Sequence, residues 1–181
     1  RASGLPVTVD ATAHHLHLTE HDIDDFNTQC NVRPPLRSVR DRDALRAGLK
    51  NGVVGAICSD HQPHEPDAKL APFAQAEPGV SALETLLPLT LKLVGEKLLD
   101  LPEAIALLTC KPADILGVEA GHLAVGDTAD VCIFDPQARW TLTADNMVSR
   151  GRNTPFLGMP LQGRVTCTLV GGRVVYEKSV D

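Results

Sequence analysis

The chain has 181 residues, of which 43% are hydrophobic and 22% charged, and its formal net charge is −6. These values are ordinary for a soluble globular protein and argue against a disordered chain. The negative charge gives no electrostatic reason to expect nucleic acid or an anionic membrane as a partner, and no apolar run approaches the roughly 18 residues that a membrane-spanning helix needs.

The cysteines indicate the redox compartment. Five are present, at positions 30, 58, 110, 132 and 167, and they form no CxxC pair. An odd number of widely spaced cysteines is typical of reduced thiols rather than of a disulfide framework or a zinc ribbon. We therefore expect a soluble, cytoplasmic protein.

The first residues have the pattern of a helix-to-strand junction. Gly4 is typical of a helix terminator, and Pro6 of the start of the next element. The first residue is not Met. From this turn chemistry we expect the chain to be a fragment of a longer polypeptide.

The next elements predict a βαβ unit. Residues 6–12 favour a strand, and Ser38 is placed to cap a helix over residues 39–51. Residues 53–58 form the short, β-branched-rich run that is typical of a buried parallel strand. The spacing of strand, helix and strand is that of a βαβ unit, which crosses over with right-handed connectivity.

A long loop and three helices are predicted next. Residues 59–79 show no regular pattern, and a loop of about twenty residues inside a compact domain is usually functional. Residues 80–99 predict an apolar helix interrupted by Pro88. Residues 102–108 and 112–116 predict two short helices, each with a proline near its start.

The composition changes at Gly117, after which the pattern favours strands. Strands are predicted over three stretches, residues 131–134, 164–170 and 173–176. We expect two parts: an α/β part over residues 1–116 and a small β layer over residues 117–181.

The richest group of chemical side chains follows the second predicted strand. Asp60, His61 and His64 lie within five residues directly after a buried run. Such groups are costly to bury without partners, and the carboxyl ends of parallel strands are where α/β barrels place their chemistry. Asp60 could be a general base, a metal ligand or a cap for the segment that follows. Zinc needs three or four ligands, and no HxH, HExxH or Cys/His spacing completes a set.

A second group of histidines is found near the first predicted strand. His14, His15, His17 and His21 suggest a metal cluster by their number alone. Strand alternation, however, points His14 and His15 to opposite faces. We expect one of them to be a polar residue at the end of the strand and the others to lie on the surface.

Two further features could bind a polar or acidic substrate. Arg33 and Arg37 flank a rigid Pro-Pro-Leu, and guanidinium suits carboxylate recognition, although a surface salt bridge is an equal alternative for Arg37. The segment that ends at Pro78 and Gly79 precedes a helix, where main-chain amides can hold an anion; an ordinary turn is the alternative.

Taken together, these motifs resemble those of the dihydroorotases, within the amidohydrolase superfamily. The matching segments are, in order, TAHHLHLTE with the family's TPHHLLLTE, RPPLRS with NPPLRS, CSDHQPH with TDHAPH, EPGVSALETLLPL with FPGxxGLET, and SRGRNTPFLGMPLQGRV with the C-terminal signature. GHLAVGDTADVCIFD resembles the composite β domain that follows the barrel in many amidohydrolases. The resemblance covers essentially the whole chain.

The resemblance implies a (β/α)₈ barrel hydrolase that interconverts dihydroorotate and N-carbamoyl-L-aspartate in pyrimidine synthesis. A metal-activated hydroxide would attack the cyclic amide, and the Asp at the end of the eighth strand would handle the proton and contact the metal. By motif that residue is Asp60. His64, Pro78 and Gly79 match substrate-binding positions. Arg33 stands where many bacterial members have Asn and could hold the substrate carboxylate.

The resemblance also implies that part of the site is missing. The family's HxH at strand 1, its bridging carboxylate or carboxylated Lys at strand 4 and its His ligands on strands 5 and 6 have no counterpart, and we expect them upstream of Arg1. The chain then corresponds to strands 7 and 8, their helices and the β layer. Alone it would retain one zinc contact, Asp60, and neither hold the zinc pair nor turn over substrate.

Three functions stay open at this stage. The first is the C-terminal portion of an active dihydroorotase. The second is a catalytically inactive dihydroorotase-like subunit that supports aspartate transcarbamoylase, a lineage that CSDHQPHEPDAKLAPF also resembles; the retained Asp60 favours the first. The third is another cyclic amidase, a hydantoinase or allantoinase. The expected partners are a small-molecule substrate, the missing N-terminal part of the barrel, and a second copy or aspartate transcarbamoylase.

Overall fold

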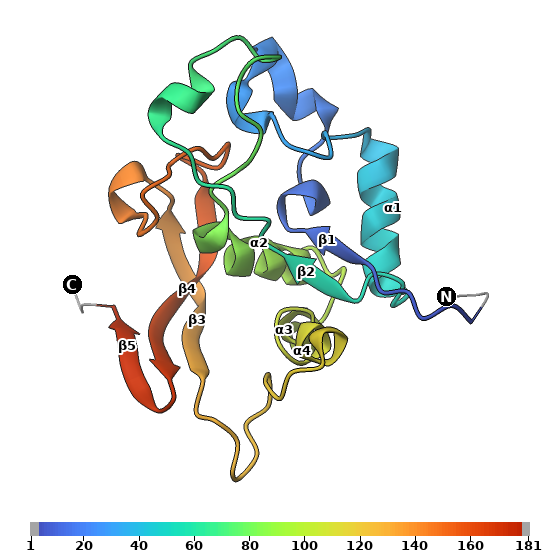
Figure 1. Cartoon of the computed structure of the whole chain (residues 1–181), viewed down its shortest axis with the longest axis vertical. Coiled ribbons are helices and arrows are strands. Elements are labelled where there is room, and N and C mark those ends of the chain that lie inside the picture. The colour runs from blue at the N-terminus through green and yellow to red at the C-terminus, as the bar shows by residue number, and fades with distance from the viewer. Residues whose placement is uncertain (1–3, 179–181) are drawn as a thin grey trace.

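The computed structural model describes residues 4–178, and Figure 1 shows a small parallel strand pair surrounded by helices beside a separate antiparallel sheet. The strands are β1 (Asp10–Thr12), β2 (Ala56–Cys58), β3 (Val131–Thr141), β4 (Pro160–Val170) and β5 (Arg173–Glu177). The α-helices are α1 (Val39–Lys50), α2 (Leu83–Gly95), α3 (Leu101–Ala106) and α4 (Cys110–Leu116). Short 3₁₀ helices are η1 (His14–Leu16), η2 (Glu20–Phe26), η3 (Thr28–Cys30), η4 (Pro66–Lys69) and η5 (Ala144–Asn146).

Strands β1 and β2 pair in parallel, with Asp10 opposite Ala56 and Thr12 opposite Cys58, and α1 connects them. This confirms the predicted βαβ unit. Both strands are shorter than predicted. Val7 and Val9 before β1 are exposed, so they lack the burial that would fix a longer strand in this part of the chain.

Helix α1 begins where the sequence predicts. The Ser38 hydroxyl accepts a hydrogen bond from the N–H of Asp41 at 3.3 Å, and the Asp41 carboxylate accepts one from the N–H of Ser38 at 3.2 Å. This reciprocal pair is a capping box, which satisfies two backbone donors at the helix start.

Helix α2 differs from its prediction at its start, at Pro88 and at its end, which is Gly95 rather than Leu99. It begins at Leu83 rather than at Val80, because Val80 pairs as a parallel bridge with His61 and is therefore extended. It also continues through Pro88, which is buried inside the helix. Its apolar side chains pack against the same core as β1 and β2.

One hydrophobic core joins both ends of the chain. Leu16 and Leu93 are fully buried in it together with Leu142 and Phe156, which belong to the part after Gly117. The division of the chain at residue 116 stays a prediction. Helix α4 does end there, with Gly117 in the left-handed conformation that favours glycine.

The small sheet has the order β3-β4-β5, with antiparallel pairing throughout. Strand β4 packs closely on α2: a Cβ on Gly163 would lie 2.2 Å from a methyl carbon of Leu91. Trp140 donates its indole N–H to the Gly163 carbonyl at 2.9 Å, and the Arg164 guanidinium lies 5.3 Å from the Trp140 ring centre. Close approach of backbone to α2 therefore fixes the sheet against the helices.

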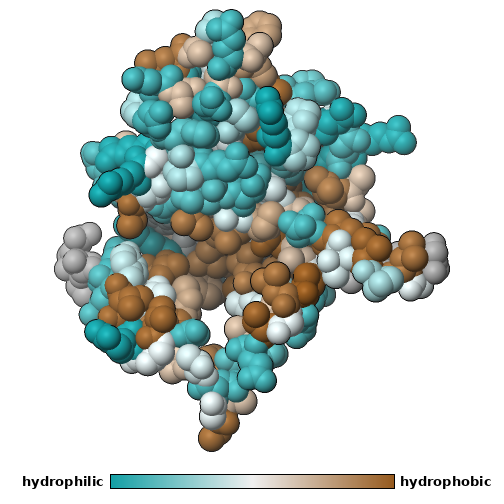
Figure 2. Space-filling model, in the orientation of Figure 1, coloured by the Kyte–Doolittle hydropathy of each residue, from teal (hydrophilic) through white to brown (hydrophobic). Residues whose placement is uncertain are grey.

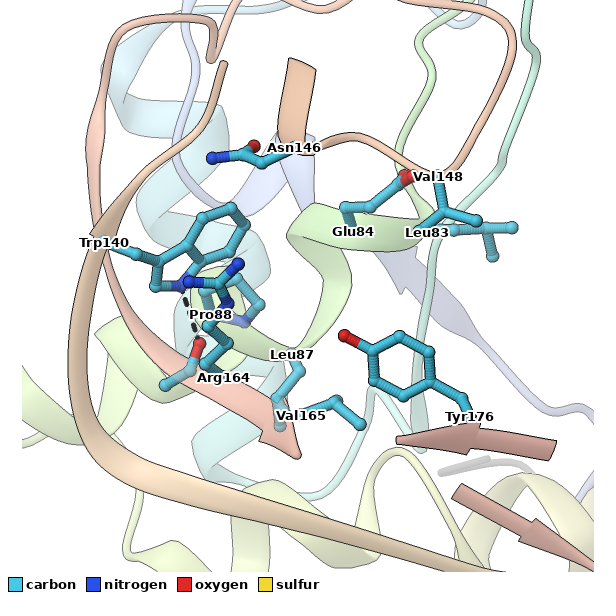
Figure 3. A pocket seen from close by; sticks show the side chains of 11 residues that line it. Leu83, Glu84, Leu87, Pro88, Trp140, Asn146, Val148, Arg164, Val165 and Tyr176 are labelled. Carbon is cyan, nitrogen blue, oxygen red and sulfur yellow. Dashed lines mark hydrogen bonds between the residues drawn. The ribbon is translucent and has the colours of Figure 1, made fainter. Parts of the chain in front are cut away.

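Two cavities lie beside the contact between α2 and the sheet, and each is lined by residues of both. One, of about 230 Å³, is lined by Trp140, Arg164, Tyr176 and the Glu84 carboxylate, and Figure 3 shows Arg164 stacked on Trp140 at its wall. The other, of about 390 Å³, is mainly apolar. In Figure 2, apolar side chains gather at the centre of the face that is turned toward the viewer. Neither cavity includes Asp60. Within residues 4–178 no helix is both long and apolar enough to span a membrane.

Candidate functional site

The parallel pairing of β1 and β2 brings two polar segments to one edge. The N–H of Ala13 donates to the Cys58 carbonyl at 2.9 Å, which extends the pairing one residue beyond β1. His14 follows directly on one side and Asp60 on the other. The Asp60 carboxylate raises the pKa of His14, against the larger lowering effect of burial. As predicted, chemical groups gather at the carboxyl end of the pair.

Asp60 has an unusual backbone conformation, with φ of +46° in the left-handed region. Asp adopts this region more readily than most residues, and such conformations concentrate at functional sites. Its Oδ1 accepts a hydrogen bond from the side-chain amide of Gln62 at 2.9 Å. Nearby, burial raises the pKa of the Cys58 thiol to about 12, so this cysteine stays protonated and is a poor nucleophile.

Of the four histidines after β1, His14 and His15 are buried and His17 is half-buried. This corrects the expectation that all but one of the four lie on the surface. His15 donates from Nε2 to the Pro34 carbonyl at 2.9 Å, and the half-buried His17 donates from Nε2 to the Leu89 carbonyl at 2.8 Å. His21 is exposed, as expected. The expectation for His14 and His15 failed for a local reason. Residues 14–16 form a 3₁₀ turn, so the alternation of side chains between the two faces of a strand does not apply to them.

His14 is the most unusual of these side chains. It is 1% exposed, and neither of its ring nitrogens has a hydrogen-bond partner among residues 4–178. Its ring centre lies 4.6 Å from that of His15. Burial, and secondarily His15, lower the pKa of His14 to about 4 against the opposing effect of Asp60, so the ring is neutral.

The structure brings together three of the four predicted substrate-binding residues, His64, Pro78 and Gly79, which are spread over 16 positions in the sequence. His64 donates from Nε2 to the Pro78 carbonyl at 3.0 Å, and Gly79 follows Pro78 directly. The N–H of Gly79 donates to the Asn31 carbonyl at 2.8 Å, so this amide is already bonded within the chain. Gly79 has φ of +128°, which a residue with a side chain rarely adopts.

Asn153 holds these pieces together, and the sequence reasoning did not single it out. Its side chain is buried, and its amide donates to the carbonyls of Gln62 at 2.9 Å and Gly79 at 3.1 Å. Its Oδ1 accepts the N–H of His64 at 2.8 Å. The sequence offered one signal for Asn153, which is its place in the C-terminal signature. When such a side-chain amide is buried, it needs hydrogen-bond partners.

Gln62 is the second residue that the sequence reasoning missed. An ideal Cβ on Gly79 would lie 2.5 Å from the Gln62 Cβ and 2.8 Å from its Oε1, so the Gln62 side chain lies directly against the Gly79 backbone. The motif comparison contained the signal: this chain has Gln62 where the dihydroorotase motif TDHAPH has Ala.

The two candidate arginines differ in their surroundings. Arg33 is exposed and precedes Pro34, whose carbonyl is bound by His15, so it lies on a loop tied to the end of β1. Arg37 lies 3.5 Å from the Asp41 carboxylate, with both side chains largely exposed. For Arg37 this confirms the surface salt bridge, an interaction that contributes little to stability.

The side chains of the described residues determine whether this chain could hold a zinc ion. In the part of the chain that the structure describes, no three His, Cys, Asp or Glu side chains are grouped closely enough to hold a metal ion. Zinc requires three or four such ligands. Asp60 offers one carboxylate, and Gln62 already donates to one of its oxygens. The described residues therefore do not fit a zinc ion by themselves.

Comparison with known proteins identifies the relatives of the chain. It is 51% identical over 177 residues to the dihydroorotase-like protein of Pseudomonas aeruginosa and 43% identical over 177 residues to the dihydroorotase of Geobacter sp. strain M21. In each case the match covers 98% of this chain and 42% of the relative, so the chain spans less than half the length of these relatives.

Solved structures and the family profile agree with these relatives. L-Hydantoinase from Arthrobacter aurescens superimposes with a TM-score of 0.90 at 31% identity, covering 99% of this chain and 41% of the hydantoinase. The fold is accordingly the C-terminal part of a (β/α)₈ amidohydrolase barrel followed by a small β sheet. Residues 3–175 match the profile of the amidohydrolase family, and the chain belongs to that family.

Proposed function

We propose that this chain forms the C-terminal part of a dihydroorotase, which opens dihydroorotate to N-carbamoyl-L-aspartate and closes it again in pyrimidine synthesis in the cytoplasm. The observation that carries the proposal is that His64 bonds to the Pro78 carbonyl beside Gly79, and that Gln62 contacts both Gly79 and Asp60 after the carboxyl end of β2. Asp60, His64, Pro78 and Gly79 are the residues that match the dihydroorotase motifs. The function belongs to the complete barrel, by which we mean a protein that carries this chain together with the rest of the fold of its relatives.

In this proposal Asp60 moves the proton. Ring opening joins a water oxygen to the amide carbonyl carbon, breaks the C–N bond and transfers one water proton to the leaving nitrogen. Asp60 accepts that proton as water attacks and returns it to the nitrogen as the bond breaks, so the carboxylate is regenerated. Ring closure runs the same steps in reverse, from protonated Asp60.

Four other residues contribute to substrate binding in this proposal. Arg33 is exposed on the loop after β1, where its guanidinium can pair with the substrate carboxylate through two hydrogen bonds. His64 and the main chain at Pro78 and Gly79 form the wall beside Asp60. Asn153 stabilises this wall, because it bonds to His64 and Gly79 and also to the nearby Gln62 carbonyl.

Zinc is part of the proposal for the complete barrel and not for this chain alone. Bound zinc would supply an activated water and polarise the amide carbonyl. Asp60 would give one ligand, and the remaining ligands would come from the rest of the barrel.

The test uses the complete barrel protein. Turnover of dihydroorotate, hydantoin and allantoin is measured in parallel, with ring opening and ring closure followed separately. The proposal expects dihydroorotate to be the preferred ring in both directions. A strong preference for hydantoin would favour the hydantoinase alternative, which the likeness to L-hydantoinase also supports.

A second function is favoured by two observations. The 51% identity is to a protein named dihydroorotase-like, against 43% to one named dihydroorotase. In addition, Gln62 already donates to Asp60. Both fit a non-catalytic subunit that supports aspartate transcarbamoylase. In that case the complete barrel protein would open no ring, and its removal would disrupt transcarbamoylase assembly.

A further inference from the structure

The backbone of Gln62 is fixed on both sides. Its N–H donates to the Val80 carbonyl at 2.9 Å, and its carbonyl accepts from the Asn153 amide at 2.9 Å. Both partners are buried. Because the backbone cannot move without breaking these bonds, the direction of the Gln62 Cα–Cβ bond is fixed as well.

From that position the side chain extends between two parts of the proposed site. Its Cβ, Cδ and Oε1 lie within 3.3 Å of the point where a Cβ on Gly79 would stand. Its Nε2 lies 2.9 Å from Oδ1 of Asp60. Gln62 therefore fills the space between the proposed proton carrier and the proposed substrate-binding main chain.

A ring that reaches Asp60 must share this space with Gln62. Moving the side chain away would break a hydrogen bond to a carboxylate, which is stronger than one between neutral groups. The alanine of the dihydroorotase motif would keep the Cβ contact with Gly79 but has none of the atoms with which Gln62 reaches Asp60. A position that is open in that motif is therefore filled in this chain.

We propose that Gln62 is a specificity-determining residue that limits the size of the cyclic amide next to Asp60. The inference rests on the proposed function and deepens it. Small rings with no bulky substituent fit beside Gln62, whereas rings that carry a large substituent on the carbon next to the amide are excluded by its volume.

The experiment compares three variants of the complete barrel protein. Gln62→Ala removes the volume and the hydrogen bond, Gln62→Met keeps a similar volume without the hydrogen bond, and Gln75→Ala is a control at an exposed glutamine of the same loop. Binding of hydantoin and of 5-benzylhydantoin is measured by calorimetry, and kcat/KM is measured for both rings. Thermal unfolding confirms that each variant is folded.

We expect Gln62→Ala to raise the preference for 5-benzylhydantoin over hydantoin by at least tenfold, in binding and in any turnover. Gln62→Met and Gln75→Ala should stay within threefold of the natural protein. An unchanged ratio in folded Gln62→Ala, or no binding of either ring to it, would overturn the inference.

Failure of the proposed function gives a different result. If the natural protein binds hydantoin but opens no ring, and Gln62→Ala gains binding of 5-benzylhydantoin, the size limit is supported and the dihydroorotase proposal is contradicted. If Gln62→Met also gains the larger ring, the hydrogen bond and not the volume is decisive, and the inference is wrong as stated.

Discussion

Oδ1 of Asn153 accepts a hydrogen bond from the backbone N–H of His64 at 2.8 Å, although 89 residues separate the two in the chain. The segment before β4 thus holds the loop after β2. The same side chain bonds to Gln62 and Gly79, so one buried amide sets the relative position of two site segments. The part of the chain after Gly117 therefore supports the candidate site directly.

Replacing Asn153 should destabilise the protein strongly. Asn153→Ala leaves two carbonyls and one N–H without their partner, and we expect a loss of about 2–4 kcal/mol in the free energy of unfolding. Asn51→Ala is the matched control, since Asn51 is exposed and its side chain accepts one hydrogen bond, from the N–H of Val53. Urea denaturation of both variants measures the difference. Equal losses would show that Asn153 does not hold the site together.

The stability of the protein should fall in mild acid because of His17. Burial, with Lys92 and Arg46 also lowering it, brings the pKa of His17 to about 4, against an ordinary value of 6.5. Between these values the unfolded chain binds more protons, so the free energy of unfolding falls as the pH falls, by up to about 1.4 kcal/mol per pH unit for this group. Nδ1 accepts from Arg46 and Nε2 donates to Leu89, which only the neutral ring can do.

The variant that tests this is His17→Gln, which can replace both hydrogen bonds but does not titrate. Its free energy of unfolding should depend less on pH between 6.5 and 4 than that of the natural protein. Some dependence will remain, because burial also lowers the pKa of His14 to about 4. His21→Gln, at an exposed site, serves as the control. An unchanged slope in His17→Gln would contradict the neutral, buried state of His17.

Arg33 and Arg37 provide a matched pair within one loop. If Arg33 holds the substrate carboxylate, Arg33→Ala in the complete barrel protein should lower kcat/KM for dihydroorotate by roughly 10²-fold, as expected for loss of a charge-assisted pair. Arg37→Ala should have little effect, because Arg37 makes an exposed pair with Asp41. Similar kinetics for both variants would make Arg33 an ordinary loop residue.

Metal content should depend on the rest of the barrel. Chelator-washed protein containing only this chain should hold zinc weakly, because the described residues offer no group of three ligands. The complete barrel protein should hold zinc tightly, and its removal should abolish turnover. Elemental analysis of both proteins decides the matter, and tight stoichiometric zinc in this chain alone would contradict the proposed origin of the ligands.

Short sequence patterns predicted much of the fold, because each of them depends on residues that are close together in the sequence. The cap at Ser38, the βαβ unit and the strands after Gly117 all depend on neighbouring side chains and turn chemistry. The error about the histidines came from the local 3₁₀ turn at residues 14–16, and the error about the start of α2 came from a contact distant in sequence. Val80 is extended because it pairs with His61, and this pairing delays the start of α2.

The sequence motifs predicted several residues of the site, but they did not predict the hydrogen bonds that connect its segments. Asp60 and His64 could be named because carboxylates and imidazoles at the end of a buried strand are unusual. Asn153 and Gln62 were missed, because amide side chains are common and their importance follows mainly from which groups they contact in the folded chain.

The measurement that tests the central proposal most directly is the pH dependence of both reaction directions in the complete barrel protein and in its Asp60→Asn variant. Ring opening needs ionised Asp60 and should increase with pH, whereas ring closure needs the protonated form and should decrease. Asp60→Asn should lower both by about 10²–10⁴-fold, while Asp67→Asn, at an exposed site, should not. Robust turnover of dihydroorotate by Asp60→Asn, with the pH trends unchanged, would contradict the role of Asp60 as the proton carrier.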